Sequence, residues 1–551
     1  MSANKEFSRR GFLKGAGAVA GLAAAAGLVG CGSPSGSGSG SDAGAAAEAG
    51  QGGAASSLPY DLQAPAEVAE TIDVEVVVVG AGISGLAATV QASELGLNVL
   101  CLEKAAGPGG NGSGTEGVFA IGSNLQIEQG IDIAPADIIS AELEESQWRG
   151  DGAMWLDMCN SSAENIDWLI GNGVRFSGLV DNYHTGLFET MHWFEEVDGT
   201  MGHGSYVVPM AQKAQDNGAV IRYNAKAYML IQGEDGSIAG LYAEDLENGG
   251  FIQINAKAVV LASGGIGANP ELLAKQGWQQ HNIDDKIVMC SPSVEGDGYK
   301  MAINAGAKDY LPLSCDQAFI GIKAVGTDST PPYSSMLNGG NGIAGAGTSL
   351  WLNQDGLRFN NEAISHVNMA APEAACCRNN KAAYAIFDQS TVDALIIDPA
   401  DLEILNAAVD GNANADSIVC GDDIAELAAN FGLDAEVVRA EVERYNGYCA
   451  GGADLDFGKA PQFMVPLATP PFYMAKLVPL FVVIIGGVYT NIRTEVLNDN
   501  LDAIPGLYAV GLEGAMLHRN VYTQNMPGSN MGNNVNTGRK AAINAAKYIA
   551  G

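Results

Sequence analysis

The clearest pattern of apolar and polar positions lies in residues 72–104. Four consecutive valines, Val76 to Val79, form a β-branched run that is typical of a strand buried on both faces of a parallel sheet. A glycine-rich turn follows at residues 80–85, and the apolar-periodic segment after it predicts a helix. A second short strand, residues 99–102, ends at Glu103. This order predicts the βαβ unit of a dinucleotide-binding domain.

The turn GAGISG has glycine where a bound pyrophosphate requires it. Gly80 permits a tight turn, Gly82 lets the backbone approach the phosphate, and Gly85 lets the helix pack on the strand. The helix N-terminus supplies N–H groups and positive potential, and Glu103 can accept both hydroxyls of a ribose. We therefore expect dinucleotide contacts from Gly80, Ala81, Gly82, Ser84, Gly85, Glu103 and Lys104.

The N-terminal segment has the composition of an export signal. Residues 8–14 (SRRGFLK) form a twin-arginine motif, and an Ala/Gly-rich apolar stretch leads to a lipobox that ends at Cys31. We expect a lipoprotein signal over residues 1–31 and a flexible linker over residues 32–66, which is rich in Gly, Ser and Ala. The protein would be exported folded and held by lipid on the outer face of the cytoplasmic membrane. The alternative is an ordinary signal in which the cysteine is accidental.

Composition limits the partners. The formal net charge of −35, from 28 basic and 63 acidic residues, argues against nucleic acid and against charge-driven binding to an anionic membrane. Membrane contact is therefore expected only through the lipid anchor. The nine cysteines include no CxxC or CxxCH spacing, so we expect no haem, iron–sulfur cluster or structural zinc. The role of the adjacent pair Cys376–Cys377 stays open.

Four further motifs follow in a fixed order. They are the glycine-rich loop at 107–114 (GPGGNGSG), VVLASGG at 259–265, EGDG at 295–298 and GLYAVG at 506–511. Together with the first motif they resemble the flavoprotein family of soluble fumarate reductases, urocanate reductases and 3-ketosteroid dehydrogenases. The resemblance spans residues 72–551 and is weakest in the middle.

The resemblance implies an α/β fold in which FAD is the cofactor. A Rossmann-like FAD-binding domain would comprise residues 67–307 and 471–551, with a mobile α+β capping domain inserted at 308–470. The loop at 107–114 would follow the flavin, and a helix starting near Asn530 would direct N–H groups to the flavin ring. The other reading of that helix start is a plain N-cap at Ser529 or Asn530. The further FAD contacts that the resemblance implies are Gly110, Asn111, Gly112, Ser113, Gly114, Gly117, Ala227, Ser263, Gly264, Asp297, Glu513, Ser529, Asn530 and Met531.

The sequence departs from the fumarate reductases at the substrate. The family's proton donor is the last arginine of an R-F-x-N-E-x-x-x-R motif, and His366 takes that position here. Val483 and Met526 stand where a histidine and an arginine bind carboxylate, and Leu512 replaces a glutamate, with Glu513 beside it. A dianion in such a pocket would lack paired charges, at a cost of several kcal/mol. We therefore expect a wider, apolar pocket and poor use of fumarate.

The expected catalytic residues are His366, Glu362, Arg358, Tyr333 and Tyr522. Glu362 precedes His366 by four residues and would orient it if the segment is helical. Further candidates to line the pocket are Gln317, His518 and Arg519.

The expected activity is reduction of an activated carbon–carbon double bond (enoate, enone or unsaturated lactone) in a small apolar or aromatic substrate. Hydride would come from flavin N5 and a proton from a side chain. Because the chain has no haem motif, a membrane-bound cytochrome or a quinol-linked donor would supply the electrons. Two alternatives stay open: a ketosteroid-type dehydrogenase that runs in the reverse direction, and a lipoprotein that binds flavin and only relays electrons.

Overall fold

The computed structural model describes residues 58–551 except 184–185, 289, 323–341, 367–370, 411–414, 515, 520–521 and 524. The chain divides into residues 1–56 and 57–551, and only the second unit is treated below. The predicted signal, most of the predicted linker and Tyr333 lie outside the described residues. For His366 only the backbone is described.

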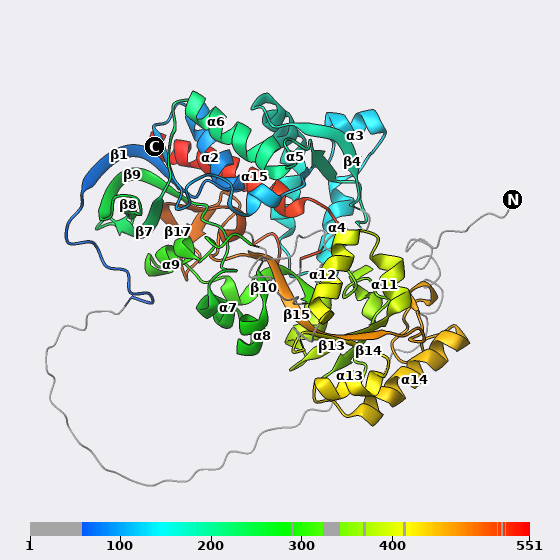
Figure 1. Ribbon diagram of the computed structural model, residues 1–551. Coiled ribbons are helices and arrows are strands. Elements are labelled where there is room, and N and C mark those ends of the chain that lie inside the picture. Colours follow the sequence, from blue (N-terminus) through cyan, green and yellow to red (C-terminus); the bar gives the residue numbers. More distant parts are fainter. Residues whose placement is uncertain are drawn as a thin grey trace, which may run out of the picture. The chain divides into compact units, whose positions relative to one another are not determined.

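The first sheet is the predicted dinucleotide-binding sheet (Figure 1). Five of its strands are parallel, in the order β17, β9, β1, β2 and β6. β7 and β8 extend it as an antiparallel meander beside β9, and β16 pairs with β17. The strands are β1 (Glu70–Val79), β2 (Val99–Leu102), β6 (Val220–Arg222), β7 (Ala225–Gln232), β8 (Ile238–Asp245), β9 (Phe251–Leu261), β16 (Glu495–Leu497) and β17 (Ala503–Ala509).

The valine run occupies the centre of this sheet. Val76, Val77 and Val78 are fully buried, as a strand with apolar layers on both faces requires. Helices α2 (Ile83–Glu94) and α15 (Ser529–Ala550) lie side by side on one face, coloured blue and red in Figure 1. Gly538 permits this contact, because a Cβ there would lie 2.3 Å from the carbonyl oxygen of Ser84. The predicted α/β fold is confirmed.

A small antiparallel sheet and several helices complete the part of the chain before the cap. The sheet has the order β3, β5, β4, and helix α15 contacts its strand β3. The elements are β3 (Gly117–Phe119), β4 (Phe176–Asp181), β5 (Met191–Phe194), α3 (Asn124–Gln129), α4 (Pro135–Glu145), α5 (Gly152–Gly171), α6 (Val208–Asp216), α7 (Pro270–Gln276), α8 (Gln280–Asp285) and α9 (Asp297–Asn304).

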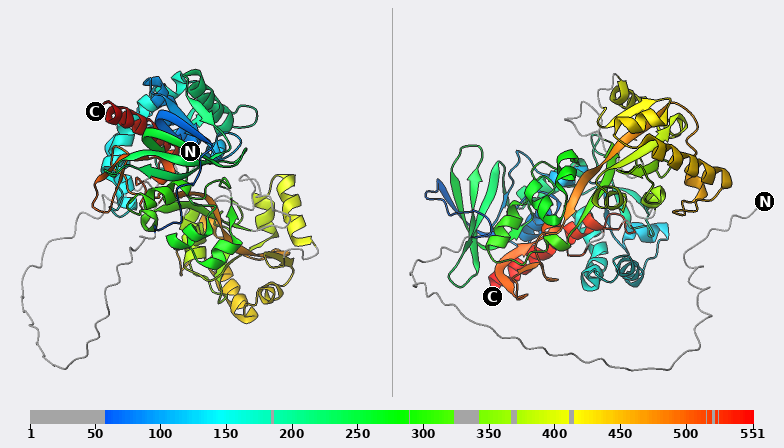
Figure 2. Two further views of the ribbon diagram at one scale, coloured as in Figure 1. Left: turned by 90° about the vertical axis from the view of Figure 1, so that its left-hand side faces the viewer. Right: turned by 90° about the horizontal axis from the view of Figure 1, so that it is seen from below.

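The second large sheet is organised around one strand, β15 (Phe472–Ile485). It pairs with β10 in parallel and with β11, β13 and β14 in antiparallel orientation, and β12 pairs with β13. Figure 2 shows this orange strand extending from the yellow helices towards the red C-terminal helix. The strands are β10 (Ile287–Val288), β11 (Cys315–Ile322), β12 (Leu350–Asn353), β13 (Ala383–Asp388), β14 (Ile418–Gly421) and β15.

This sheet corrects the predicted domain boundary at residue 471. The chain does not return to the first sheet there, because β15 forms the centre of the second sheet up to Ile485. Its 14 residues are almost all buried, which requires partners on both edges. The helices around the sheet are α10 (Ala371–Glu373), α11 (Gln389–Leu395), α12 (Pro399–Val409), α13 (Ile424–Asn430) and α14 (Ala435–Gly451).

The described end of the predicted linker is packed rather than free. The backbone N–H of Tyr60 donates to Asn304 Oδ1 at 3.0 Å, and its ring meets that of Tyr299 edge-on at 6.1 Å. The folded region therefore begins before residue 66. None of the helices in the described ranges has both the length and the apolar character that a membrane span needs.

Candidate active site

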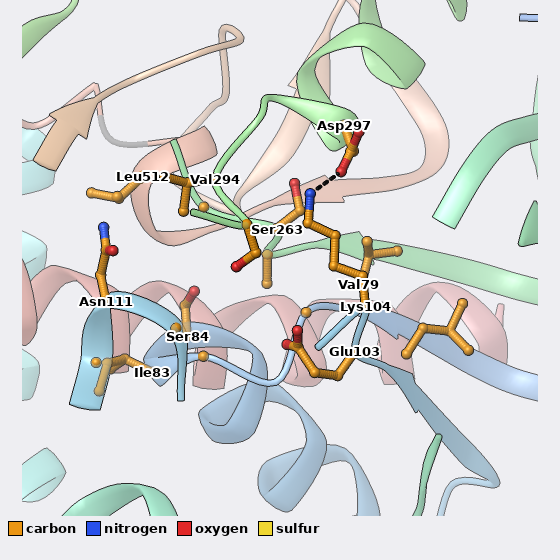
Figure 3. A pocket seen from close by; sticks show the side chains of 18 of the residues that line it. Val79, Ile83, Ser84, Glu103, Lys104, Asn111, Ser263, Val294, Asp297 and Leu512 are labelled. Atoms are coloured by element: carbon orange, nitrogen blue, oxygen red, sulfur yellow. Dashed lines mark hydrogen bonds and ion pairs between the residues drawn. The ribbon is translucent and has the colours of Figure 1, made fainter. Parts of the chain in front are cut away.

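The first cavity lies at the carboxyl ends of β1 and β2, where α/β sheets bind dinucleotides (Figure 3). Twelve of the predicted cofactor residues line it: Gly80, Gly82, Ser84, Glu103, Lys104, Gly110, Asn111, Gly112, Ala227, Ser263, Gly264 and Asp297. They come from four of the five motifs, and Ala227 lies outside these motifs. The resemblance therefore predicted a set of residues that the fold brings together.

The glycines of the first turn have different structural roles. Gly80 has a φ of 103°, and a Cβ there would lie 2.5 Å from the carbonyl oxygen of Ala262. A Cβ at Gly85 would lie 1.8 Å from the carbonyl oxygen of Gly80, so this glycine serves helix–strand packing. At Gly82 a Cβ would meet only the Gly109 oxygen, at 3.6 Å, while the residue faces the cavity. Its small size leaves room for a ligand.

Glu103 is placed to bind a ribose. Its carboxylate accepts from the N–H of Ala81 and of Ala105, each at 2.8 Å, and the side chain still faces the cavity. Ala81 therefore acts through Glu103 and does not line the cavity itself. Next to it, Lys104 Nζ lies 2.8 Å from Asp297 Oδ2 (Figure 3) and 2.8 Å from Glu295 Oε2. Burial alone would lower the pKa of Lys104. The two carboxylates outweigh this effect, so the pKa of Lys104 is raised.

Glu513 holds the loop that contains Ser263, and its contact with the cofactor stays a prediction. Its carboxylate accepts from Ser263 N at 2.6 Å and from Ser263 Oγ at 2.9 Å, and it does not line the cavity. Burial raises the pKa of Glu513 to about 8, although the hydrogen bonds from Ser263 act in the opposite direction. Leu512 lines the cavity instead. Glu513 therefore positions the Ser263 loop.

Two other predicted contacts, Ser113 and Asn111, also hold the loops together. Ser113 Oγ lies 3.4 Å from His203 Nδ1, and Asn111 Oδ1 accepts from Ser291 N at 2.5 Å. Asn111 still lines the cavity, whereas Ser113 does not. Gly112 fits beneath Ile83, because a Cβ there would lie 2.5 Å from Ile83 Cδ1.

A second cavity of about 280 Å³ adjoins the first and shares five residues with it. It lies between the loop at 110–117, the N-terminus of α15 and strands β11 and β15. Its lining residues are Ile83, Asn111, Gly112, Gly114, Thr115, Glu116, Gly117, Tyr183, Met191, Gln317, Val482, Val483, Leu512, Tyr522, Pro527, Gly528, Asn530, Met531 and Asn534.

The N-terminus of α15 is built to meet a polar ligand. Gly528 has a φ of 79°, and no side chain caps the helix in this described stretch. Ser529 Oγ, Asn530 Oδ1 and Asn534 Oδ1 are buried without a hydrogen-bond partner. A flavin ring offers donors and acceptors to such groups, and a helix N-terminus favours negative charge. These residues therefore fit FAD, with Asn530 and Met531 lining the second cavity and Ser529 just behind them.

The walls of the second cavity are mostly apolar. Val483 and Leu512 line it, as the sequence predicts, and Gln317 pairs with Val483 across β11 and β15. The sequence predicts Met526 beside Val483 in the pocket, and the structure partly corrects this. Met526 is buried in an apolar cluster with Trp155 and does not line the cavity. Of the described lining residues, none carries a positive charge, and Glu116 carries a negative one.

Glu116 and Tyr183 form a pair that the sequence analysis missed. Tyr183 Oη donates to Glu116 Oε2 at 2.6 Å, and both side chains line the second cavity. The place of Glu116 between Gly114 and Gly117 could have indicated it, since both neighbours were predicted contacts. Tyr183 lies 67 residues away and has no local motif.

Arg358 and Glu362 belong to a buried ion-pair cluster of the cap, and their catalytic role stays a prediction. Arg358 donates to both oxygens of Glu362, each at 2.9 Å, and to Asp454 at 3.0 and 3.1 Å. Lys459 Nζ lies 3.3 Å from Glu362 Oε2. Burial favours a raised pKa for Asp454, but the bonds from Arg358 and from the Lys459 N–H lower it to about 2. All four side chains are buried away from both cavities.

The expected orientation of His366 by Glu362 stays a prediction. Residues Glu362–His366 form a 3₁₀ helix, in which positions i and i+3 align and positions i and i+4 do not. The carboxylate of Glu362 is already engaged by Arg358. The role of His366 as proton donor stays a prediction, because its side chain is not among those described.

Tyr522 lines the second cavity, and His518 lies directly behind it. The His518 ring meets Tyr522 at 4.9 Å and Trp155 at 5.5 Å, both edge-on. Burial lowers the pKa of His518 to about 3, and neither ring nitrogen has a partner. His518 is thus a neutral support for Tyr522. Arg519 lines neither cavity.

The cysteines show no sign of redox or metal chemistry in the described part of the chain. Cys376 and Cys377 are buried, and burial raises the pKa of both thiols well above the usual value, which makes them unreactive. Among the residues that the structure describes, no group of three His, Cys, Asp or Glu side chains is arranged to hold a metal ion.

The fold and the two adjoining cavities are those of an FAD-dependent oxidoreductase. Residues 75–520 match the family described as FAD binding domain, and the chain belongs to that family. It is 31% identical to the vinyl phenol reductase of Lactiplantibacillus plantarum over 86% of this chain and 96% of that protein. It is 30% identical to the urocanate reductase of Eggerthella lenta over 80% and 70% of the two chains.

A solved structure supports the same family assignment. The open conformation of a flavocytochrome c3 fumarate reductase matches 88% of this chain and 80% of its own, with a TM-score of 0.66 and 25% identity. The cofactor is FAD, and the chain is an enzyme that acts on carbon–carbon double bonds.

Proposed function

We propose that this protein is an extracytoplasmic reductase that saturates a carbon–carbon double bond in a small, uncharged apolar or aromatic substrate. The observation that carries this proposal is the charge of the second cavity, whose described lining includes Val483 and Leu512 and no cation. A dianion there would be buried without partners, which is costly. The name of the vinyl phenol reductase, at 31% identity, supports an aromatic alkene.

Each part of the site has a task in this reaction. Glu103 and the turn at Gly82 would hold the adenosine and pyrophosphate of FAD, and the N-terminus of α15 would face the flavin ring. When bound and reduced, FAD supplies hydride. Val483, Leu512 and Tyr522 would exclude water and hold the alkene, and His366 would donate the proton. We further infer that a membrane-bound cytochrome or quinol-linked donor supplies the electrons outside the cytoplasmic membrane.

Anaerobic oxidation of a reduced viologen dye by the FAD-loaded protein tests the proposal. The assay offers styrenes, enones, unsaturated esters and lactones, and fumarate, one at a time. We expect dye oxidation with an uncharged aromatic alkene and recovery of the saturated product. His366→Ala is expected to keep FAD and lose most of the turnover. Flavin that the dye reduces and that then stays reduced with every alkene offered would favour a protein that binds flavin and only relays electrons.

A further inference from the structure

We infer that the Glu116–Tyr183 pair accepts the proton of a phenolic hydroxyl, so that the substrates of this enzyme are alkenes conjugated to a phenol. This inference deepens the proposed function and rests on it. The pair lines the second cavity, and Glu116 itself lies in the loop at 110–117. Its described surroundings include no cation and several apolar side chains, among them Met191 and Val482.

The direction of the hydrogen bond decides what the pair can bind. Tyr183 gives its own proton to Glu116 at 2.6 Å, so towards a ligand its oxygen acts as an acceptor. A phenol O–H can donate to it, whereas a ketone or ester carbonyl cannot. The carboxylate of Glu116 also repels anionic ligands in a cavity of low dielectric. The pair therefore selects an uncharged hydrogen-bond donor.

Tyr183 is held in place by its surroundings. Its φ of 50° is rare for a bulky residue and is a conformation that functional sites often retain. Asp181 Oδ1 accepts from Tyr183 N at 2.9 Å and from Trp193 Nε1 at 2.8 Å. The rings of Tyr183 and Trp193 stack at 5.4 Å. Asp181 and Trp193 are thus positioning residues that fix the hydroxyl against Glu116.

The proton path makes an unactivated alkene reducible. A vinyl group on a phenol has no electron-withdrawing substituent. When the phenolic proton passes through Tyr183 to Glu116 and the terminal carbon gains a proton from the site's acid, the substrate becomes a quinone methide. Its benzylic carbon is then electron-poor and accepts hydride, which the reduced cofactor supplies. The oxygen regains the proton from Glu116, so the net addition is one hydride and one proton.

The activity test compares para-hydroxystyrene with its methyl ether on the FAD-loaded protein and reduced viologen. We expect kcat/KM to be about 100-fold or more higher for the phenol, the range of acid–base catalysis. Tyr183→Phe, which keeps the stacked ring, and Glu116→Gln should each lower the phenol-to-ether ratio by about the same factor. Tyr448→Phe removes a tyrosine–carboxylate hydrogen bond outside both cavities and is the matched control.

A binding measurement separates this inference from the proposed function. 4-Ethylphenol and 4-ethylanisole are titrated against the flavin spectrum of the oxidised protein. The wild type should bind the phenol at least about tenfold more tightly, and Tyr183→Phe should bind both alike. Equal use and equal binding of phenol and ether by the wild type would overturn the inference, even if the ether is reduced. If no alkene supports oxidation of the dye, the proposed function and this inference both fail.

Discussion

At the residue scale, burial gives Glu513 an unusual titration. Its pKa is about 8 in the folded protein against 4.5 ordinarily, because the side chain is fully buried beside Ser263. The folded state therefore binds a proton that the unfolded state releases between these values. The stabilisation from this group is complete below pH 4.5 and is lost as the pH rises through 8, at up to about 1.4 kcal/mol per pH unit.

Glu513→Gln should remove this dependence on pH. Glutamine keeps an acceptor for Ser263 and does not titrate, so the melting temperature of the variant should fall less between pH 5 and pH 8 than that of the wild type. Thermal unfolding at several pH values measures the difference. Parallel curves for the two proteins would show that Glu513 is not protonated in the fold.

Glu362→Gln should destabilise the cap without emptying the cofactor site. Removing one member of a buried ion-pair cluster costs about 3–5 kcal/mol, because Lys459 would lose the carboxylate 3.3 Å away. Denaturant unfolding followed by Trp fluorescence measures the loss, and the flavin spectrum should be unchanged. Glu436→Gln is the control, since its pair with Arg439 is exposed and worth at most about 1 kcal/mol. Equal stability of the two variants would contradict the structural role.

The sequence predicted those site residues whose surroundings are formed by neighbours close in the chain. Glu103 and Gly82 belong to one βαβ unit, whose spacing alone determines their geometry. Tyr183 meets Glu116 only after the chain folds over 67 residues, so no periodicity indicates the pair. Arg358 and Glu362 matched a family motif, yet Asp454, 96 residues further on, engages the same guanidinium. A motif match therefore predicted position but not environment.

At the element scale, two glycines of the turn between β1 and α2 have different roles. Gly82 leaves room for the ligand, and Gly85 permits helix–strand packing. Gly82→Ala should fold normally, since its Cβ would meet only the Gly109 oxygen at 3.6 Å, but should weaken FAD binding by about tenfold or more. Gly85→Ala should instead disturb the fold, because its Cβ would lie 1.8 Å from the Gly80 oxygen. Flavin content and melting temperature measure both effects. Normal FAD affinity in Gly82→Ala would contradict the assigned path of the pyrophosphate.

Strand β15 shows why long-range pairing escaped prediction. The run FYMAKLVPLFVVII is apolar enough for a central strand, but its sequence does not specify which sheet it joins. The pairing with β10, β11, β13 and β14 involves residues as far apart as Ile287 and Leu480 and is a property of the folded chain. The helical segment at 422–451 likewise divides into α13 and α14 around Gly432, whose φ is 70°. A single glycine inside a periodic segment indicated this break only weakly.

At the scale of the whole molecule, we propose that the leader predicted over residues 1–31 places the enzyme on the outer face of the cytoplasmic membrane. Cys31→Ala should leave export intact and release the mature protein from the membrane, because the lipid would have no attachment site. Replacing Arg9 and Arg10 by lysine should keep the protein in the cytoplasm. Fractionation with detection of the protein measures both. Membrane association of Cys31→Ala equal to the wild type would contradict lipid anchoring.

The charge selectivity of the second cavity is the central claim, and one measurement tests it most directly. It is the ratio of kcat/KM for para-hydroxystyrene to that for fumarate, determined anaerobically with reduced viologen and the FAD-loaded wild type. Because the described lining offers a dianion no cation and presents the carboxylate of Glu116, we predict a ratio of about 100 or more. A ratio of one or below, with fumarate turned over readily, would contradict the account.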